Sequence, residues 1–420
     1  MNPASTGPVA VPPANVPIPP TSGVSADRPS GHWPGLIATA LTATVAVMPG
    51  FTVGALATSI EADLNISRSA LGLAMSAFYA ATALGSPFAK RLAARLPVPA
   101  SLTIAALTAA AVMTVAAQIH TLTALTALLV AGGLANGLVQ PAAGRLIAAR
   151  APAHRRSLAA GLVGAALGAA TLLPGVLVAF VEPEYGWRAS MLVAGLIALL
   201  PIVLAPLAKA PPTPPDSPTA VGDNRSSSPA TTGRVLVLWA LAAALSATGN
   251  NAVATYFVQL GDHAGLPALL TGNLLSLSAV LAIAVRLTAG ALTDLAPRHN
   301  PTVITAMMAA GALGLVLIAT GSPVLFVAGA VLSFSAGWGW TGLLLATTLR
   351  LVPGRTENAG HTVQVGIYSG ATVAPFAFGA LSSTLGFTGT ALIAALAAMA
   401  AAVAMAAGTL TLRRQRTGTP

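Results

Sequence analysis

One arginine, Arg286, lies in an otherwise uncharged and mostly apolar stretch that is long enough, at about 20 residues, to cross a bilayer. A guanidinium is costly to remove from water, so a cation in such a stretch is a candidate functional group. Its planar fork of N–H donors matches a carboxylate or another anion. Two interpretations are open. Arg286 contacts an anionic substrate or a gate, or its side chain reaches the membrane surface and supports the loop at Asp294.

Uncharged polar and aromatic side chains form a second group of candidates for a substrate site or a gate. They are Asn136, Gln140, Asn250, Asn251, Gln364, Tyr368, Trp338 and Trp340. Asn136 and Gln140 are four residues apart, so they share one face of a helix, and Gln364 and Tyr368 do the same. Amides in apolar helices also join neighbouring helices, and tryptophans also pack, so both kinds of role remain open.

The sequence lacks the residues that several kinds of chemistry require. There is no cysteine, and the histidines at 32, 120, 154, 263, 299 and 361 have no metal-ligand spacing. We therefore expect no metal, no cofactor and no enzyme. No Gly-x-x-x-x-Gly-Lys-Ser/Thr loop is present, so we expect no ATP-driven pumping. A receptor or scaffold would carry a soluble sensing domain, and none is evident.

The amino-acid composition indicates that these candidate residues belong to a membrane protein. Hydrophobic residues make up 55% of the 420 residues, and only 7% are charged, whereas soluble domains have about 25%. This excludes an ordinary cytosolic enzyme, a nucleic-acid-binding domain and a disordered protein. The net charge of +10 is distributed along the chain and forms no patch, so no nucleic acid is expected as a partner.

Charge-free apolar stretches predict twelve membrane-spanning helices. In the first half they are about 35–58, 71–89, 101–119, 122–144, 158–181 and 189–208, and in the second half about 235–258, 269–291, 302–320, 323–347, 361–384 and 387–410. Open sheets cannot satisfy their backbone polar groups in lipid, and no stretch alternates as a barrel strand would. The predicted fold class is an all-α polytopic membrane protein.

Basic residues set the predicted orientation. Arg68 and Arg188 are the only basic residues on the side opposite the termini, and 17 of the 20 lie on the side of the termini. The positive-inside rule therefore predicts cytoplasmic N- and C-termini in a cell membrane, the inner or plasma membrane.

Polar segments divide the chain. Residues 1–32 are predicted to be a disordered cytoplasmic tail, 33–208 a six-helix bundle, 209–234 a cytoplasmic linker, 235–412 a second six-helix bundle and 413–420 a cytoplasmic tail. An offset of 205 residues aligns Arg145 with Arg350 and Arg150 with Arg355. Together with matching glycines, this register predicts two pseudo-symmetric halves that arose by duplication.

This arrangement resembles the major facilitator superfamily over residues 33–412. That superfamily has a Gly-x-x-x-Asp-Arg-x-Gly motif in the cytoplasmic loop after its second helix, often with a weaker copy after the eighth. The matching residues are Gly85, Lys90 and Arg91 in the first copy and Gly290 and Asp294 in the second. Ala89 stands in place of the first Asp, and Leu295 in place of the second basic residue, which weakens the expectation of the usual charged gate but not that of the fold.

Two further segments carry the resemblance. Gly186-Trp187-Arg188 is similar to a turn that is common in the superfamily, and we interpret Trp187 as an anchor at the membrane interface rather than a substrate contact. The segment Gly337–Leu343, with Gln364-Val365-Gly366 and Pro375, is similar to the tenth and eleventh helices of bacterial facilitators of the cyanate/nitroimidazole type.

The resemblance implies a secondary transporter that works by alternating access around a central site. We expect a monomer in the lipid bilayer that moves a small-molecule substrate, and Arg286 favours an anionic one. The alternative is a multidrug-type exporter of lipophilic compounds, which the sparse charge would suit. No Asp or Glu lies deep in a span, so uniport, coupling to a proton and exchange with a counter-substrate all remain open.

Overall fold

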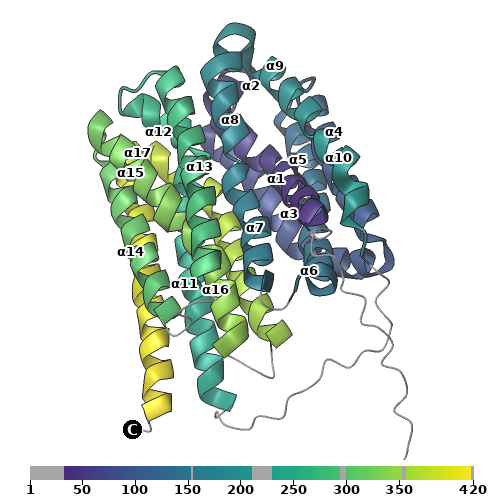
Figure 1. The fold of residues 1–420 in the computed structure, drawn as a ribbon. Helices are drawn as coiled ribbons and strands as arrows, with labels where there is room; N and C mark the ends of the chain where they lie inside the picture. The colour runs from purple at the N-terminus through teal and green to yellow at the C-terminus, as the bar shows by residue number, and fades with distance from the viewer. Residues whose placement is uncertain (1–32, 153–154, 211–228, 294–298, 352–355, 418–420) are drawn as a thin grey trace, which may run out of the picture. The chain divides into compact units, whose positions relative to one another are not determined.

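The computed structural model describes residues 33–152, 155–210, 229–293, 299–351 and 356–417, and these segments contain helices and no strand (Figure 1). The first half contains α1 (Trp33–Ala55), α2 (Ala57–Leu64), α3 (Arg68–Arg95), α4 (Val98–Ala116), α5 (Leu122–Asn136), α6 (Val139–Arg150), α7 (Arg156–Ala169), α8 (Leu172–Val176), η2 (Leu177–Val181), α9 (Glu182–Ile197), α10 (Leu200–Leu204) and η3 (Ala205–Ala208). Only the turn Ala170-Thr171 separates α7 from α8, which continues directly into η2, so we assign the three to one span.

The second half contains α11 (Pro229–Thr255), α12 (Phe257–His263), α13 (Ala268–Thr293), α14 (Asn300–Ala319), α15 (Pro323–Leu332), η5 (Ser333–Gly337), α16 (Trp338–Leu351) and α17 (Thr356–Thr417). The segments η2 and η5 are π-helical, and η3 is a 3₁₀-helix. The helix α11 begins at Pro229, within the segment predicted as a linker, and α17 continues to Thr417, within the predicted C-terminal tail. Both helices are therefore longer than the predicted boundaries allow.

Ten described helical stretches are long and apolar enough to cross a membrane. Two of them are longer than one crossing, Leu172–Ala208 and Thr362–Arg414, and each contains a glycine with positive φ, Gly186 (φ 77°) or Gly386 (φ 68°). Glycine adopts this conformation without a Cβ clash, so the chain can turn there. Divided at these glycines, and with α7 and α8 joined to η2, the stretches agree with the twelve predicted spans.

The structure corrects the prediction that the first motif copy lies in a loop. Gly85, Lys90 and Arg91 all lie inside α3, which continues to Arg95, so the first copy is helical and not a loop. The helix continues through Ser86-Pro87 and ends before Leu96-Pro97. Gly85 packs against Leu134 of α5, and the side chains of Lys90 and Arg91 are exposed. Gly290 belongs to α13, and Asp294 lies outside the described residues.

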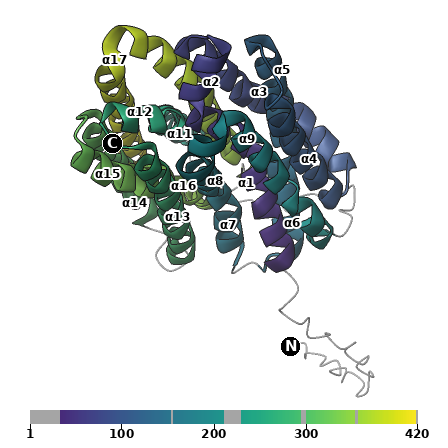
Figure 2. The ribbon, with the colours of Figure 1, turned by 90° about the horizontal axis from the view of Figure 1, so that it is seen from above.

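Glycines bring the two halves into close contact along two pairs of helices, α3 with α17 and α7/α8 with α13 (Figures 1 and 2). A Cβ on Gly72 of α3 would lie 2.5 Å from the carbonyl oxygen of Pro375, and a Cβ on Gly272 of α13 would lie 2.5 Å from that of Gly175. Small residues permit such backbone approach in membrane helices. We call the end of the bundle that contains α2 and α12 the α2–α12 end, and the opposite one the termini end.

Candidate functional site: a buried arginine and a latch between the halves

Arg286 of α13 is 3% exposed and lies between the two halves. Its Nε and Nη2 donate to the carbonyl oxygen of Trp338 at 3.0 and 2.8 Å, and its Nη1 donates to that of Gly164, in α7 of the first half, at 2.9 Å. The interpretation in which this side chain reaches the membrane surface is therefore wrong. The carbonyls satisfy part of the guanidinium and hold it in the interior.

The positive charge of Arg286 has no carboxylate within ion-pair distance among the described residues. The side chain lines a small cavity of about 10 Å³ with Gly161, Gly164, Gly290, Gly339, Gly342, Leu343 and Ala346. A cavity of this size holds about one water molecule. Five of its eight lining residues are glycines, so backbone rather than side chains forms most of the wall beside the cation.

The two candidate tryptophans differ. Trp338 is 8% exposed, accepts the Arg286 hydrogen bonds with its carbonyl oxygen, and has its ring centroid 5.8 Å from the guanidinium carbon. Trp340 is 1% exposed and packs in the hydrophobic core of the second half. Trp338 thus belongs to the surroundings of Arg286, and Trp340 is a packing residue.

Three of the candidate amides join helices. Asn136 at the end of α5 donates to the Thr82 hydroxyl of α3 at 3.3 Å. Asn250 donates to the Gly337 carbonyl oxygen at 3.1 Å and Asn251 to that of Ala371 at 3.3 Å, which ties α11 to η5 and α17. Tyr79 of α3 adjoins the Asn251 side chain, so Asn251 also lies where the halves meet.

The remaining candidates lie on α6 and α17. Gln140 is exposed, and the described contacts do not bring it to Arg286. Gln364 and Tyr368 are half-buried, and their side chains adjoin each other. Tyr368, Pro375 and Ser382 are spaced by seven residues, about two turns. Because Pro375 and Ser382 contact the first half, Tyr368 lies on the helix face that is turned toward it.

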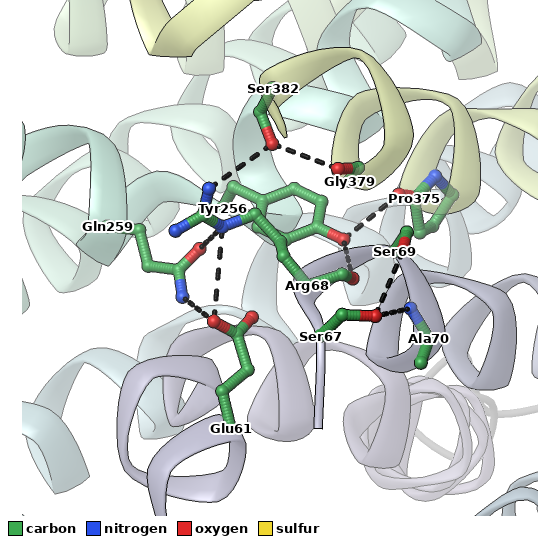
Figure 3. Close-up of polar contacts among 10 residues, drawn as sticks. All are labelled: Glu61, Ser67, Arg68, Ser69, Ala70, Tyr256, Gln259, Pro375, Gly379 and Ser382. Atoms are coloured by element: carbon green, nitrogen blue, oxygen red, sulfur yellow. Dashed lines mark hydrogen bonds and ion pairs between the residues drawn. The ribbon is translucent and has the colours of Figure 1, made fainter. Parts of the chain in front are cut away.

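A polar network links the halves at the α2–α12 end, and we call it the latch: Glu61, Arg68, Tyr256, Gln259 and Ser382 (Figure 3). Arg68, at the start of α3, donates from Nε to Gln259 Oε1 at 3.1 Å and from Nη1 to Ser382 Oγ at 3.3 Å. Its guanidinium carbon also lies 4.3 Å from the centroid of the Phe387 ring. One residue of the first half thus holds α12 and α17 of the second.

Glu61 of α2 completes the latch from the first half. Its Oε2 accepts a hydrogen bond from Gln259 Nε2 at 3.1 Å and lies 3.9 Å from Arg68 Nε, whereas its Oε1 is buried and has no hydrogen-bond partner among the described residues. Burial raises the pKa of the Glu61 carboxyl above its ordinary value, against the opposing effects of the Gln259 hydrogen bond and the Arg68 charge. The segment α2 follows the first membrane-spanning stretch and lies outside it.

Hydrogen bonds of the α17 backbone extend the same contact toward the centre. The Tyr256 hydroxyl donates to the Pro375 carbonyl oxygen at 3.0 Å, and the Phe376 N–H donates to the Ser76 hydroxyl of α3 at 3.0 Å. Tyr256 stacks on Phe378 with ring centroids 4.8 Å apart. The α2–α12 end is therefore closed in this structure by hydrogen bonds between the halves and by the contact of the Arg68 guanidinium with the Phe387 ring.

A second ion pair, between Arg188 and Asp63, joins segments of the first half alone. Arg188 donates to Asp63 Oδ2 at 2.7 Å and to the carbonyl oxygens of Ala117 and Ile119, both at 2.8 Å. The preceding Trp187 is 5% exposed and packs in the core beneath the Arg188 guanidinium. Trp187 is thus a core residue and not the interfacial anchor that the sequence suggested.

Comparison with known proteins defines the class. Residues 36–364 match the Major Facilitator Superfamily, and the chain belongs to that superfamily. It is a multi-pass membrane protein of a superfamily whose members are secondary transporters and not enzymes. A gallate transporter of Pseudomonas putida is 30% identical over 199 residues, which cover 47% of this chain and 43% of that relative. The match therefore spans less than half the length of the relative, and it does not point to the cyanate/nitroimidazole-type subgroup.

Solved structures share the fold. A bacterial homologue of the human lysosomal transporter Spinster, in an inward-facing and unoccupied conformation, superposes with a TM-score of 0.63 at 16% identity, covering 92% of this chain and 96% of that one. The occupied inward-facing conformation gives a TM-score of 0.65 at 14% identity, covering 91% and 96%. At these identities the likeness shows the fold alone.

Proposed function

We propose that this protein transports a small organic anion across the cell membrane by alternating access, and that Arg286 binds the anion between the two halves. The observation that carries the proposal is a guanidinium that is 3% exposed, lines a cavity and has no described carboxylate partner. A buried cation is stabilised by an anion that enters the same site, so an anionic ligand would gain from its charge.

The relative named above supports the anionic class. Gallate is a carboxylate, and the relative that shares 30% identity is named for it. The cavity of about 10 Å³ is too small for such a ligand in this conformation, so we propose that movement of the halves opens it and brings the ligand against Trp338 and the glycine-lined wall. The resemblance of the tenth and eleventh helices to the cyanate/nitroimidazole-type facilitators remains a prediction and adds no further support to this proposal.

The latch would then be the gate at one end of the path. Its contacts join α2 and α3 to α12 and α17, so this end must open for the substrate to pass. The positive-inside pattern predicts that the α2–α12 end lies outside and the termini lie in the cytoplasm. On that orientation the structure is closed to the outside.

One observation favours the second candidate, export of lipophilic compounds. An apolar groove of about 520 Å³ lies between α13, α14 and α16, and Leu343 lines both this groove and the cavity at Arg286. A lipophilic molecule in the membrane could occupy such a groove. The groove contains no buried charge among its lining residues, so it does not account for Arg286.

A thermal-stability screen of the purified protein separates the two candidates. Gallate, other small carboxylates, inorganic anions, sugars and lipophilic cations are compared, because a ligand that binds only the folded state stabilises it, by about 2.7 kcal/mol at a hundredfold excess over Kd. We expect carboxylates to raise the unfolding temperature of the parent and of Arg95→Gln, which changes an exposed arginine, but not of Arg286→Gln. Stabilisation by lipophilic cations alone would favour the exporter.

A further inference from the structure

Glu61 is the one described carboxylate that connects the two halves directly, and only half of it is satisfied. Oε2 accepts from Gln259 of the second half, while Oε1 is buried without a partner. The Glu61 side chain is 15% exposed. A buried carboxylate oxygen without a donor costs free energy while the group is ionised, and protonation lowers that cost because a neutral group is cheaper to bury than a charge.

We propose that Glu61 is a proton-binding site of the latch, and that a proton bound there favours the closed α2–α12 end. The inference rests on the proposed alternation of the two halves, and it identifies a proton as a regulator of this transporter. It does not depend on which substrate is carried or on Arg286.

The sign follows from the change in surroundings when the end opens. Separation of α2 from α12 would remove Gln259 from Glu61 and admit water, so the pKa of the carboxyl would return toward its ordinary value of 4.5. Its pKa is higher in the closed state because burial outweighs the Gln259 hydrogen bond and the Arg68 charge. The closed state therefore holds the proton more tightly. By linkage, lowering the pH through this range shifts the population toward the closed state.

Other charged groups around Glu61 do not replace it in this role. The titratable and charged groups of the surrounding segments at this end are Arg68 of α3, Tyr256 just before α12, Asp262 and His263 of α12, Glu182, Glu184, Tyr185 and Arg188 of α9, and Asp63 on α2 itself. Asp63 pairs with Arg188, and Glu182 accepts from Ser59, all within the first half. Asp262 and His263 are exposed. Of the carboxylates that the structure describes, Glu61 alone combines burial, an unsatisfied oxygen and a hydrogen bond across the halves.

The chain has no cysteine, so two spin labels can be attached without background. Thr58→Cys on α2 and Ser383→Cys on α17 place exposed labels on the two halves at this end. In lipid nanodiscs without substrate, electron paramagnetic resonance gives the ratio of short to long label distances from about pH 8 down to about pH 4.5. We expect the short-distance population to grow as the pH falls, by up to about tenfold in ratio for each unit of pKa difference between the states.

Two variants decide the assignment. Glu61→Gln should remove most of the pH dependence and keep the short distance at every pH, because glutamine is neutral and still accepts from Gln259. Asp63→Asn, which neutralises an exposed carboxylate on the same helix, should behave as the parent does. A pH dependence that survives Glu61→Gln, a parent without pH dependence, or a short population that grows with rising pH would each overturn the proposal.

A second variant tests the same site if Glu61→Gln does not fold. Gln259→Leu removes the amide donor that opposes the effect of burial on the pKa. We expect its pH-dependent transition to occur at a higher pH than in the parent. An unchanged or lower transition pH would contradict a proton site at Glu61. Because no substrate is present, these results do not depend on whether Arg286 binds an anion.

Discussion

At the residue scale, single-sequence reasoning found the buried cation but not its surroundings. A charge in a long apolar stretch is visible in the sequence, so Arg286 could be selected. Its partners could not, because the carbonyl oxygens of Gly164 and Trp338 belong to the backbone and lie 122 and 52 residues away. Backbone acceptors carry no residue-type signal. The alternative role at the membrane surface was rejected only by the burial of the side chain.

For Arg68, in contrast to Arg286, the role of the residue itself was not predicted from the sequence. The sequence placed Arg68 on the side opposite the termini and gave no indication of a contact between the halves. Its partners Gln259 and Ser382 lie 191 and 314 residues away and come together only when the two halves pack. The one available signal was that Arg68 and Arg188 alone break the positive-inside pattern, and both of them are held by an acidic partner.

We predict that Arg68→Ala weakens the closed state. The change removes two hydrogen bonds across the halves and the contact with Phe387. At about 1 kcal/mol for each hydrogen bond, the ratio of closed to open molecules should fall by about tenfold or more. The Thr58/Ser383 spin-label pair measures it. Ser69→Ala is the matched control, because the Ser69 hydroxyl contacts only Ser67 in this network. Equal populations in Arg68→Ala and the parent would remove Arg68 from the gate.

At the element scale, apolar stretches located the spans well and their ends less well. Hydropathy records where lipid begins, whereas a helix continues until a turn-forming residue ends it. For this reason α3 runs from Arg68 to Arg95 although the apolar stretch is shorter, and α1 leads directly into α2. The π-helical segment η5, which precedes Trp338, has no sequence signature that we could use. It adjoins the residue whose carbonyl oxygen accepts from Arg286.

Glycines in the sequence have different structural roles that composition alone does not distinguish. A Cβ on Gly272 would lie 2.5 Å from a backbone oxygen, so packing requires glycine there, whereas a Cβ on Gly164 would meet nothing within 4 Å. Gly186 and Gly386 serve a third role as positive-φ turns between spans. The sequence predicted close packing in general, and the contacts assign it to particular helix pairs.

At the scale of the whole molecule, the fold and the class of protein followed from the sequence, and the contact between the halves did not. Twelve spans, a central polar interruption and two motif copies were enough to predict a major-facilitator-like fold, and the match over residues 36–364 confirms the superfamily. Which end is closed depends on contacts between residues far apart in the chain. The duplication of the halves and the cytoplasmic position of the termini remain predictions.

The predicted orientation can be measured with fused reporters. A reporter after Ile66, between α2 and α3, should lie outside, and one after Ala220, between the two halves, should lie in the cytoplasm. The reason is that 17 of the 20 basic residues lie on the side of the termini. Alkaline phosphatase is active outside and green fluorescent protein inside, so each site is tested with both. The reverse pattern would invert the proposed outer gate.

The central claim is that an anion crosses the membrane by way of Arg286. The most direct measurement is uptake, into proteoliposomes, of the radiolabelled carboxylate that stabilises the parent most, beginning with gallate. Charge-assisted hydrogen bonds contribute about 1.5–3 kcal/mol, so Arg286→Gln should reduce the uptake rate by about 10- to 100-fold. Arg286→Lys should retain part of it, and Arg95→Gln nearly all. Uptake by Arg286→Gln at the parent's rate, with equal protein in the vesicles, would contradict the account.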